Sequence, residues 1–138
     1  MKSVVSGPFV HTVHIRYLEV DSQGVVFNMW YMAYFDDAMG AFLVHNGVPR
    51  ETVLAAGVDA QLVRVAIDWR GALRMGTPAE ISVRTARVGN TSFALEYSVT
   101  QNNELTANAE IVYVCVARDG SGKRPVPPLI KQALGLPA

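Results

Sequence analysis

The feature that most limits what this chain can fold into is an apolar run from Met29 to Val44. Hydrophobic residues leave no continuous polar face there, so a helix formed by this run must be wrapped by other elements. Asn28 is suited to cap the start of the helix, and Asn46-Gly47 is a typical stop signal. From Met29 to His45 the helix would rise roughly 25 Å, enough to thread one small domain. The run is too short for a membrane span, which needs about twenty apolar residues, and Asp36-Asp37 interrupts it.

The length and composition predict one folded domain over residues 1–138. Half of the residues are hydrophobic, which argues against a disordered chain, and the formal net charge of zero offers no basic field to nucleic acid. Residues 1–8 carry one charge and no apolar segment of signal-peptide length. Cys115, the single cysteine, stands in an apolar strand pattern that favours a buried thiol. We therefore expect a cytoplasmic protein with no nucleic-acid partner.

Alternation of apolar and polar residues predicts five strands. They run from Phe9 to Tyr17, Gln61 to Trp69, Ala79 to Val88, Ser92 to Gln101 and Leu105 to Ala117. In the second strand, Val63, Val65, Ile67 and Trp69 fall on one face. Turn residues between the last three strands indicate antiparallel hairpins. Residues 48–54 indicate a short helix or loop, and residues 129–134 a last helix.

The predicted order is a strand, a long helix and four strands in meander-like succession. An α+β arrangement satisfies these patterns, with a five-stranded antiparallel sheet curled around one long apolar helix. Because an open curled sheet has unpaired edges, pairing with a second copy would protect them. A homo-oligomer is therefore expected.

The stretch from Tyr17 to Tyr31, YLEVDSQGVVFNMWY, resembles the signature of the 4-hydroxybenzoyl-CoA and Tol-Pal-associated acyl-CoA thioesterases. The segments 67–70, 74–77 and 87–93 also resemble that family. The resemblance implies a hot-dog fold and hydrolysis of an acyl-CoA in a dimer or tetramer. It places the pocket between two subunits, with the neighbour's segment from Gly57 to Val63 as one wall. Asn28 is a departure, because many Tol-Pal-associated members carry a histidine there.

By this resemblance Asp21 falls on the family's catalytic aspartate. An aspartate is ordinarily a carboxylate at neutral pH, and it can activate a water or attack a thioester carbonyl directly. Free N–H groups at a helix start can stabilise the resulting oxyanion, which makes the backbone N–H near Asn28 the candidate donor. Gly24 would permit a tight turn and close approach to a substrate. Judged by local sequence alone, this segment is more often a plain turn with an Asx-type hydrogen bond.

Further residues are candidates for binding the substrate. Val25 and Tyr31 belong to the stretch around Asp21. Arg87 and the hairpin residues Asn90, Thr91 and Ser92 could meet the phosphates of coenzyme A, although solvated surface positions are the simpler interpretation. The histidines at positions 11, 14 and 45 are too dispersed for a metal signature, and no metal or redox cofactor is expected. Asp36 and Asp37 are weaker candidates for a second catalytic carboxylate.

Three other functions stay open. The substrate could be a thioester of an acyl carrier protein, or the chain could bind acyl groups without turnover. An Asp21 far from any pocket, or paired to a buried cation, would favour that binding function. A hot-dog hydratase or dehydratase is the third alternative. The hot-dog hydratases have a different pattern, an aspartate followed five residues later by a histidine. This sequence has Val26 at that place, which argues against a hydratase.

Overall fold

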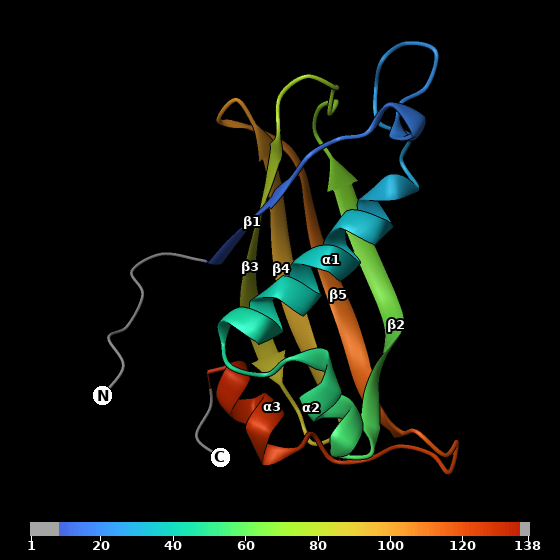
Figure 1. Cartoon of the computed structure of the whole chain (residues 1–138), viewed down its shortest axis with the longest axis vertical. Helices are drawn as coiled ribbons and strands as arrows, with labels where there is room; N and C mark the ends of the chain where they lie inside the picture. Colours follow the sequence, from blue (N-terminus) through green and yellow to red (C-terminus); the bar gives the residue numbers. More distant parts are fainter. Residues whose placement is uncertain (1–8, 136–138) are drawn as a thin grey trace.

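The structure, a computed structural model, describes residues 9–135 (Figure 1). Residues 1–8, on which the expectation about a signal peptide depends, lie outside the described residues. The elements in chain order are β1 (Phe9–Val13), the 3-10 turn η1 (Tyr17–Glu19), α1 (Trp30–His45), α2 (Arg50–Ala55), β2 (Val58–Trp69), β3 (Ala79–Val88), β4 (Ser92–Gln101), β5 (Glu104–Ala117) and α3 (Pro128–Ala133). No helix among the described residues is long and apolar enough to cross a membrane.

The five strands form one antiparallel sheet in the order β1-β3-β4-β5-β2. Only β3, β4 and β5 follow one another as a meander, so the prediction of four strands in meander-like succession was wrong. Both sides of β3 are occupied by β1 and β4, and β2 therefore pairs with β5 at the far edge. β5 lies between β4 and β2 and therefore has a partner strand on each side.

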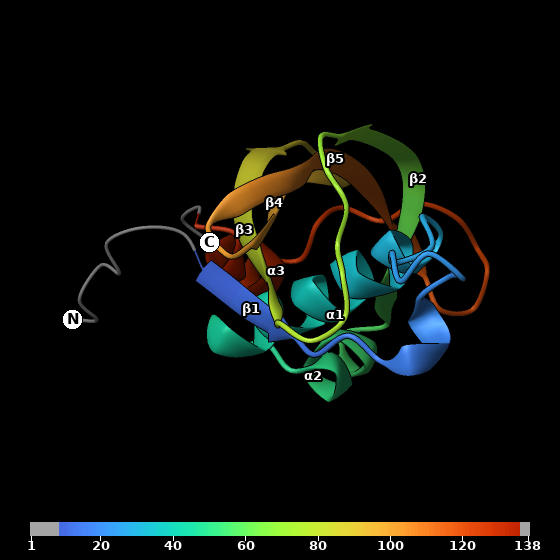
Figure 2. The same ribbon diagram turned by 90° about the horizontal axis from the view of Figure 1, so that it is seen from above.

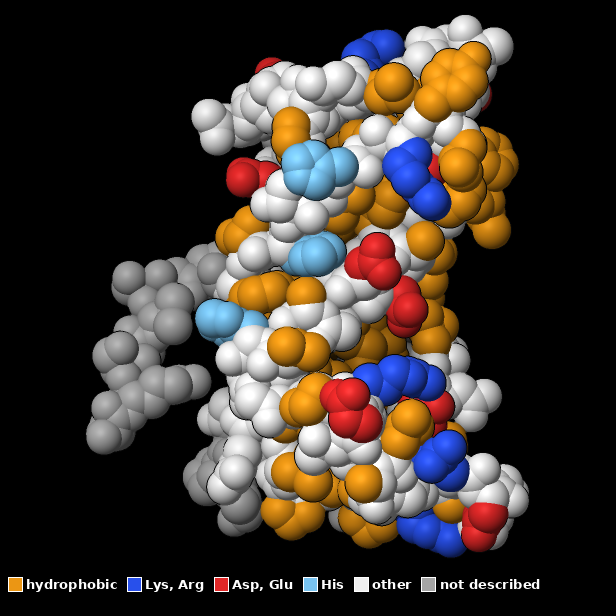
Figure 3. Space-filling view, viewed as in Figure 1, with side chains coloured by type: hydrophobic (Ala, Val, Ile, Leu, Met, Phe, Trp, Pro, Cys, Tyr) orange, Lys and Arg blue, Asp and Glu red, His pale blue; other side chains and the backbone are white. Residues whose placement is uncertain are grey.

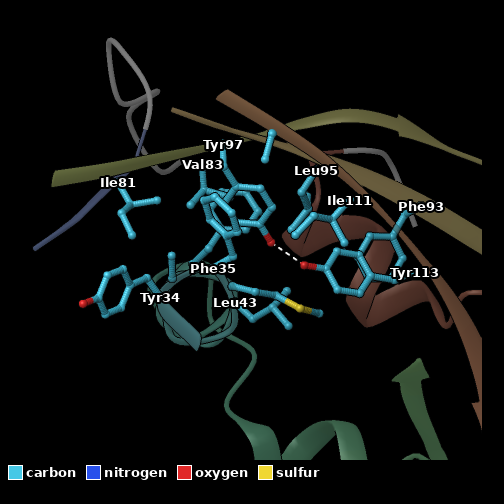
Figure 4. Close-up of a cluster of buried hydrophobic side chains, with 14 of the residues drawn as sticks. Tyr34, Phe35, Leu43, Ile81, Val83, Phe93, Leu95, Tyr97, Ile111 and Tyr113 are labelled. Carbon is cyan, nitrogen blue, oxygen red and sulfur yellow. Dashed lines mark hydrogen bonds between the residues drawn. The ribbon is translucent and has the colours of Figure 1, made fainter. Parts of the chain in front are cut away.

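The sheet curls around α1, which lies across its concave face (Figure 2). Helix residues such as Phe35 and Leu43 meet inward side chains of β3, β4 and β5, and the Phe35 and Tyr97 rings are 4.8 Å apart between centroids (Figure 4). The wrapping is incomplete. Asp36, Asp37 and Val44 are exposed on the opposite side of the helix, where Figure 3 shows acidic and histidine side chains.

Several element boundaries differ from the prediction. β1 ends at Val13 because the chain turns into η1, where the Glu19 carboxylate accepts the Arg16 N–H. α1 begins at Trp30, and its N-cap is Met29 without a side-chain capping hydrogen bond, so the prediction that Asn28 caps the helix was wrong. In β2 a bulge between Leu62 and Arg64 interrupts the predicted alternation of faces, and Val63 is 53% exposed.

Cys115 is fully buried in β5, as predicted. Burial, with a smaller contribution from the charge of Asp59, raises the pKa of the Cys115 thiol to about 11. A thiol with such a pKa stays protonated and is a poor nucleophile near neutral pH. The residue is therefore part of the core.

Candidate active site

Asp21 stands at the start of a tight turn that the chain makes before α1. Val20 and Val26 form an antiparallel bridge on either side of it. The Asp21 N–H donates to the Val25 carbonyl at 2.9 Å, and the Gly24 N–H donates to the Asp21 carbonyl at 2.9 Å. Gly24 has a φ of +75°, a left-handed conformation that glycine adopts at little cost. Gly24 therefore has the turn role expected of it.

The two carboxylate oxygens of Asp21 have different surroundings. Oδ1 accepts the backbone N–H groups of Gln23 at 2.8 Å and Val25 at 3.2 Å. Within residues 9–135, Oδ2 accepts no hydrogen bond and no basic side chain pairs with Asp21. The side chain is exposed. One oxygen thus orients the carboxylate, and the other is free to react or to accept a proton.

The start of α1 supplies free donors directly after this turn. The N–H groups of residues 30–32 donate to the carbonyls of residues 27–29 at 2.9 to 3.3 Å. The N–H groups of Asn28 and Met29 have no acceptor among the described residues. Free N–H groups at a helix start favour negative charge. Unpaired donors of this kind can stabilise an oxyanion.

The Asp21 turn is fixed to one end of the sheet. The Val26 N–H donates to the Leu73 carbonyl at 2.9 Å, and Val25 forms a bridge with Arg74. The Gln101 carboxamide, at the end of β4, accepts the Arg74 N–H at 3.0 Å and donates to the Arg74 carbonyl at 2.7 Å. The loop that follows β2 therefore holds the turn in place.

A buried carboxylate, Glu19, lies two residues before Asp21 and was not predicted. It is 4% exposed and accepts hydrogen bonds from the Arg16 backbone, the Arg16 guanidinium and the Tyr34 hydroxyl. Burial raises the pKa of Glu19, but the hydrogen bonds from Arg16 and Tyr34 outweigh it, so the pKa is lowered overall. The only signal in the sequence was a charged residue inside the stretch that resembles the thioesterase signature.

The other candidate residues do not all gather at this turn. The Tyr31 ring is 1% exposed and packs edge-on against Trp69 at 5.8 Å, so it belongs to the core. Val25 is part of the turn and partly exposed. Burial raises the pKa of the Tyr31 hydroxyl above its usual value, in keeping with its place in the core.

Arg87 and the β3–β4 hairpin lie at the opposite end of the sheet. Ser92 begins β4 and Gln101 ends it, and ten residues of strand span about 33 Å. The Arg87 guanidinium bonds to Glu110 at 3.3 Å, and the Asn90 carbonyl accepts the Val126 N–H. The structure therefore does not bring Arg87, Asn90, Thr91 and Ser92 to Asp21 within one chain.

Asp21 does not line any of three cavities found among residues 9–135. One of them, of about 400 Å³, lies between α1, α2 and the start of β2. Its floor is apolar and includes Met39, Leu43 and Phe93, and its rim carries Asp59 and Arg50. Among residues 9–135, no three His, Cys, Asp or Glu side chains are grouped to hold a metal ion.

A profile of the thioesterase-like superfamily matches residues 8–134, nearly the whole chain. The protein belongs to this superfamily. The superfamily's hot-dog fold is the α+β arrangement seen here, with a five-stranded antiparallel sheet around α1. The fold predicted from the sequence is thus confirmed.

Named relatives in the thioesterase-like superfamily are distant. The acyl-CoA thioester hydrolase YbgC of Escherichia coli is 25% identical over 105 residues, which cover 75% of this chain and 78% of that one. The 1,4-dihydroxy-2-naphthoyl-CoA hydrolase of Synechococcus elongatus is 21% identical over 126 residues, covering 90% and 93%. A protein of Thermus thermophilus superposes with a TM-score of 0.84 at 29% identity, covering 91% of this chain and 95% of that one.

Proposed function

We propose that the protein hydrolyses an acyl-CoA thioester to a free acid and coenzyme A, with Asp21 as the catalytic carboxylate. The observation that carries this proposal is the state of that carboxylate. Two backbone N–H groups hold Oδ1, and within residues 9–135 neither Oδ2 nor the two N–H groups at the start of α1 have a hydrogen-bond partner. Membership of the thioesterase-like superfamily and the acyl-CoA substrates in the names of two relatives support it.

Two routes are compatible with this geometry. Oδ2 can attack the thioester carbonyl, expelling the thiolate and leaving a mixed anhydride that water then hydrolyses. It can instead take a proton from a water that attacks the same carbon. In both routes the carbonyl oxygen becomes negative, and the N–H groups of Asn28 and Met29 are the donors that stabilise it. The left-handed φ of Gly24 lets its N–H close the turn onto the Asp21 carbonyl.

We further propose that a second copy of the chain completes the pocket. Asp21 is exposed and lines none of the three cavities found among residues 9–135. By the criterion given above, this favours an acyl-binding protein if the chain acts alone, and it is also the state expected of half a site that a second copy completes. β2 is an edge strand with one partner, and exposed apolar side chains such as Leu62 and Val63 lie along it. An edge of this kind is stabilised by pairing with its own copy.

Antiparallel pairing of β2 with a second β2 sets the Val58 end of one copy against the Trp69 end of the other. The Trp69 end leads into the loop that holds the Asp21 turn. The Val58 end borders the 400 Å³ cavity, which would then lie beside the Asp21 of the neighbour and receive the acyl group. The β3–β4 hairpin of the copy that supplies the cavity, with Arg87 and Asn90 to Ser92, lies at that same Val58 end.

The test is release of free thiol from short, long and aromatic acyl-CoA substrates by the natural protein and by Asp21→Asn. We expect the variant to lose at least about 100-fold in kcat, the scale of a catalytic acid or base. Ser22→Ala is the matched control, because Ser22 is exposed in the same turn and makes no hydrogen bond among the described residues. Circular dichroism confirms that each variant is folded.

The same panel separates the alternative functions. Release of thiol from acyl carrier protein thioesters alone would identify the carrier as the substrate. Binding of acyl-CoA without turnover by the natural protein would contradict the enzymatic proposal and favour an acyl-binding protein. A hydratase needs a second base, yet both polar contacts of the Asp21 carboxylate within the described chain are backbone N–H groups.

A further inference from the structure

We infer that Glu19 is a positioning residue, which acts through the Tyr34 hydroxyl to fix Asp21 relative to the N–H groups at the start of α1. The inference rests on the proposed thioesterase function. It assigns a role to the one buried carboxylate among residues 9–135, a side chain that the proposed chemistry does not use.

Every oxygen of the Glu19 carboxylate has a specific partner. Oε1 accepts the Tyr34 hydroxyl at 2.7 Å and the Arg16 N–H at 3.0 Å. Oε2 accepts the Arg16 Nε–H at 2.8 Å, and the same guanidinium lies 5.7 Å from the Trp30 ring centroid. Both the turn before Asp21 and the first turn of α1 therefore contact this small cluster.

The backbone of Glu19 holds the other side of the Asp21 turn. Its carbonyl accepts the Phe27 N–H at 3.0 Å, so the chain segments before and after the turn are joined at this residue. Phe27 directly precedes Asn28, one of the free donors. A displacement of Glu19 would therefore move both the carboxylate of Asp21 and the donors proposed for the oxyanion.

The Glu19–Tyr34 bond is the one side-chain hydrogen bond that joins residues 16–25 to α1 in the described part of the chain. Tyr34 is 2% exposed, on the fifth residue of the helix, and its hydroxyl points away from the core cluster (Figure 4). The bond thus connects the element that carries the carboxylate with the element that carries the donors.

A purely structural reason for this bond is weak. Moving a carboxylate out of water is costly even when it is paired, and apolar residues of similar volume often stabilise a fold as well or better. A hydrogen-bonded charge does something that an apolar contact does not, because it fixes direction as well as distance. Direction is what a carboxylate and an oxyanion site need relative to each other.

The test compares Tyr34→Phe with Tyr97→Phe. Both variants keep a buried ring against α1 or the sheet and lose one hydroxyl. Among the described residues the Tyr97 hydroxyl bonds to Tyr113 and to no residue of the Asp21 turn. We expect Tyr34→Phe to lower kcat about 10- to 100-fold with little change in KM, the effect of a misplaced reacting group. We expect Tyr97→Phe to lower Tm and to leave kcat unchanged.

Amide hydrogen exchange gives a second reading that does not need activity. If Glu19 positions the turn, exchange at Asp21, Gly24 and Phe27 should be about ten-fold faster or more in Tyr34→Phe and unchanged in Tyr97→Phe. If the natural protein releases no thiol, the proposed function fails while exchange still decides whether the turn is held by this bond. Unchanged exchange or an unchanged kcat in Tyr34→Phe would overturn the positioning role.

A double-mutant cycle with Glu19→Gln localises the effect. Losses in kcat from Glu19→Gln and Tyr34→Phe should be strongly non-additive if both act through one bond. Additive losses would show that the two residues act separately, and the inference would be wrong.

Discussion

Glu19 and Asp21 are carboxylates two residues apart that the fold treats in opposite ways. Glu19 is buried with each oxygen bonded, whereas Asp21 is exposed with one oxygen free. The difference arises from the direction of the chain, because η1 turns Glu19 toward Tyr34 and the following turn carries Asp21 outward. Glu19 is thereby suited to position the turn, and Asp21 is suited to react.

Glu19 should also leave a signature in the pH dependence of stability. Its pKa in the folded protein is lowered from 4.5, so its contribution to stability is complete above that value and is lost as pH falls through the lower folded pKa. The natural protein should therefore lose free energy of unfolding more steeply than Glu19→Gln as pH falls from about 5 to about 3. Urea unfolding at a series of pH values measures this, and parallel curves would contradict it.

The sequence could predict the turn at Asp21 and Gly24, because the hydrogen bonds of a turn join residues that are close in the sequence. The Asx-type hydrogen bonds of Asp21 and the left-handed φ of Gly24 involve neighbours within four residues. The burial of Glu19 depends instead on Tyr34, fifteen residues away on another element. No periodicity reports such a contact, so the sequence could not show it.

The strands were predicted correctly where their pattern depends on neighbouring residues. The prediction failed where it depended on pairing between strands that are distant in the sequence. The bounds of β3 and β4 were predicted and confirmed, because burial alternates over most of each strand. The pairing of β2 with β5 was missed because it is decided by which edges remain free after the hairpins form. The bulge at Val63 was missed for the same reason, since it depends on register with β5.

The β4–β5 turn allows a test at the level of an element. Asn102 and Asn103 have φ values of 53° and 64°, the left-handed conformation that a two-residue hairpin turn requires. Asn103→Val should destabilise the protein by about 1–2 kcal/mol, because a β-branched residue is strained there, whereas Asn103→Gly should be neutral or slightly stabilising. Thermal unfolding of both variants decides this, and equal Tm values would contradict it.

For the whole molecule, the site residues predicted from sequence fall at two ends of the sheet. Asp21, Gly24, Val25 and Asn28 lie at one end, and Arg87 with residues 90–92 lies at the other. A single chain gives no reason for that separation. The proposed two-fold pairing through β2 would explain the separation, because it would place opposite ends of the two copies side by side.

Mixing inactive variants tests this arrangement. Asp21→Asn removes the carboxylate, and Ala60→Trp fills the 400 Å³ cavity that we propose a neighbour supplies. Each variant alone should be inactive, but refolding them together should restore about a quarter of the natural activity, since half of random dimers are mixed and each has one intact site.

Asp21→Asn mixed with Asp21→Ala is the control and should recover nothing. Mixed dimers that are visible by native mass spectrometry yet inactive would show that each site is built from one chain.

The bonds from Val26 to Leu73 and from Val25 to Arg74 have a consequence for protein engineering. A peptide of residues 9–45 would contain Asp21, Glu19 and Tyr34, yet it would lack the loop after β2 and the Gln101 side chain that hold the turn in place. Grafting that stretch onto another scaffold would transfer the residues without their geometry. We therefore expect that the site cannot be transferred to another protein as a short segment, although its residues are close together in the sequence.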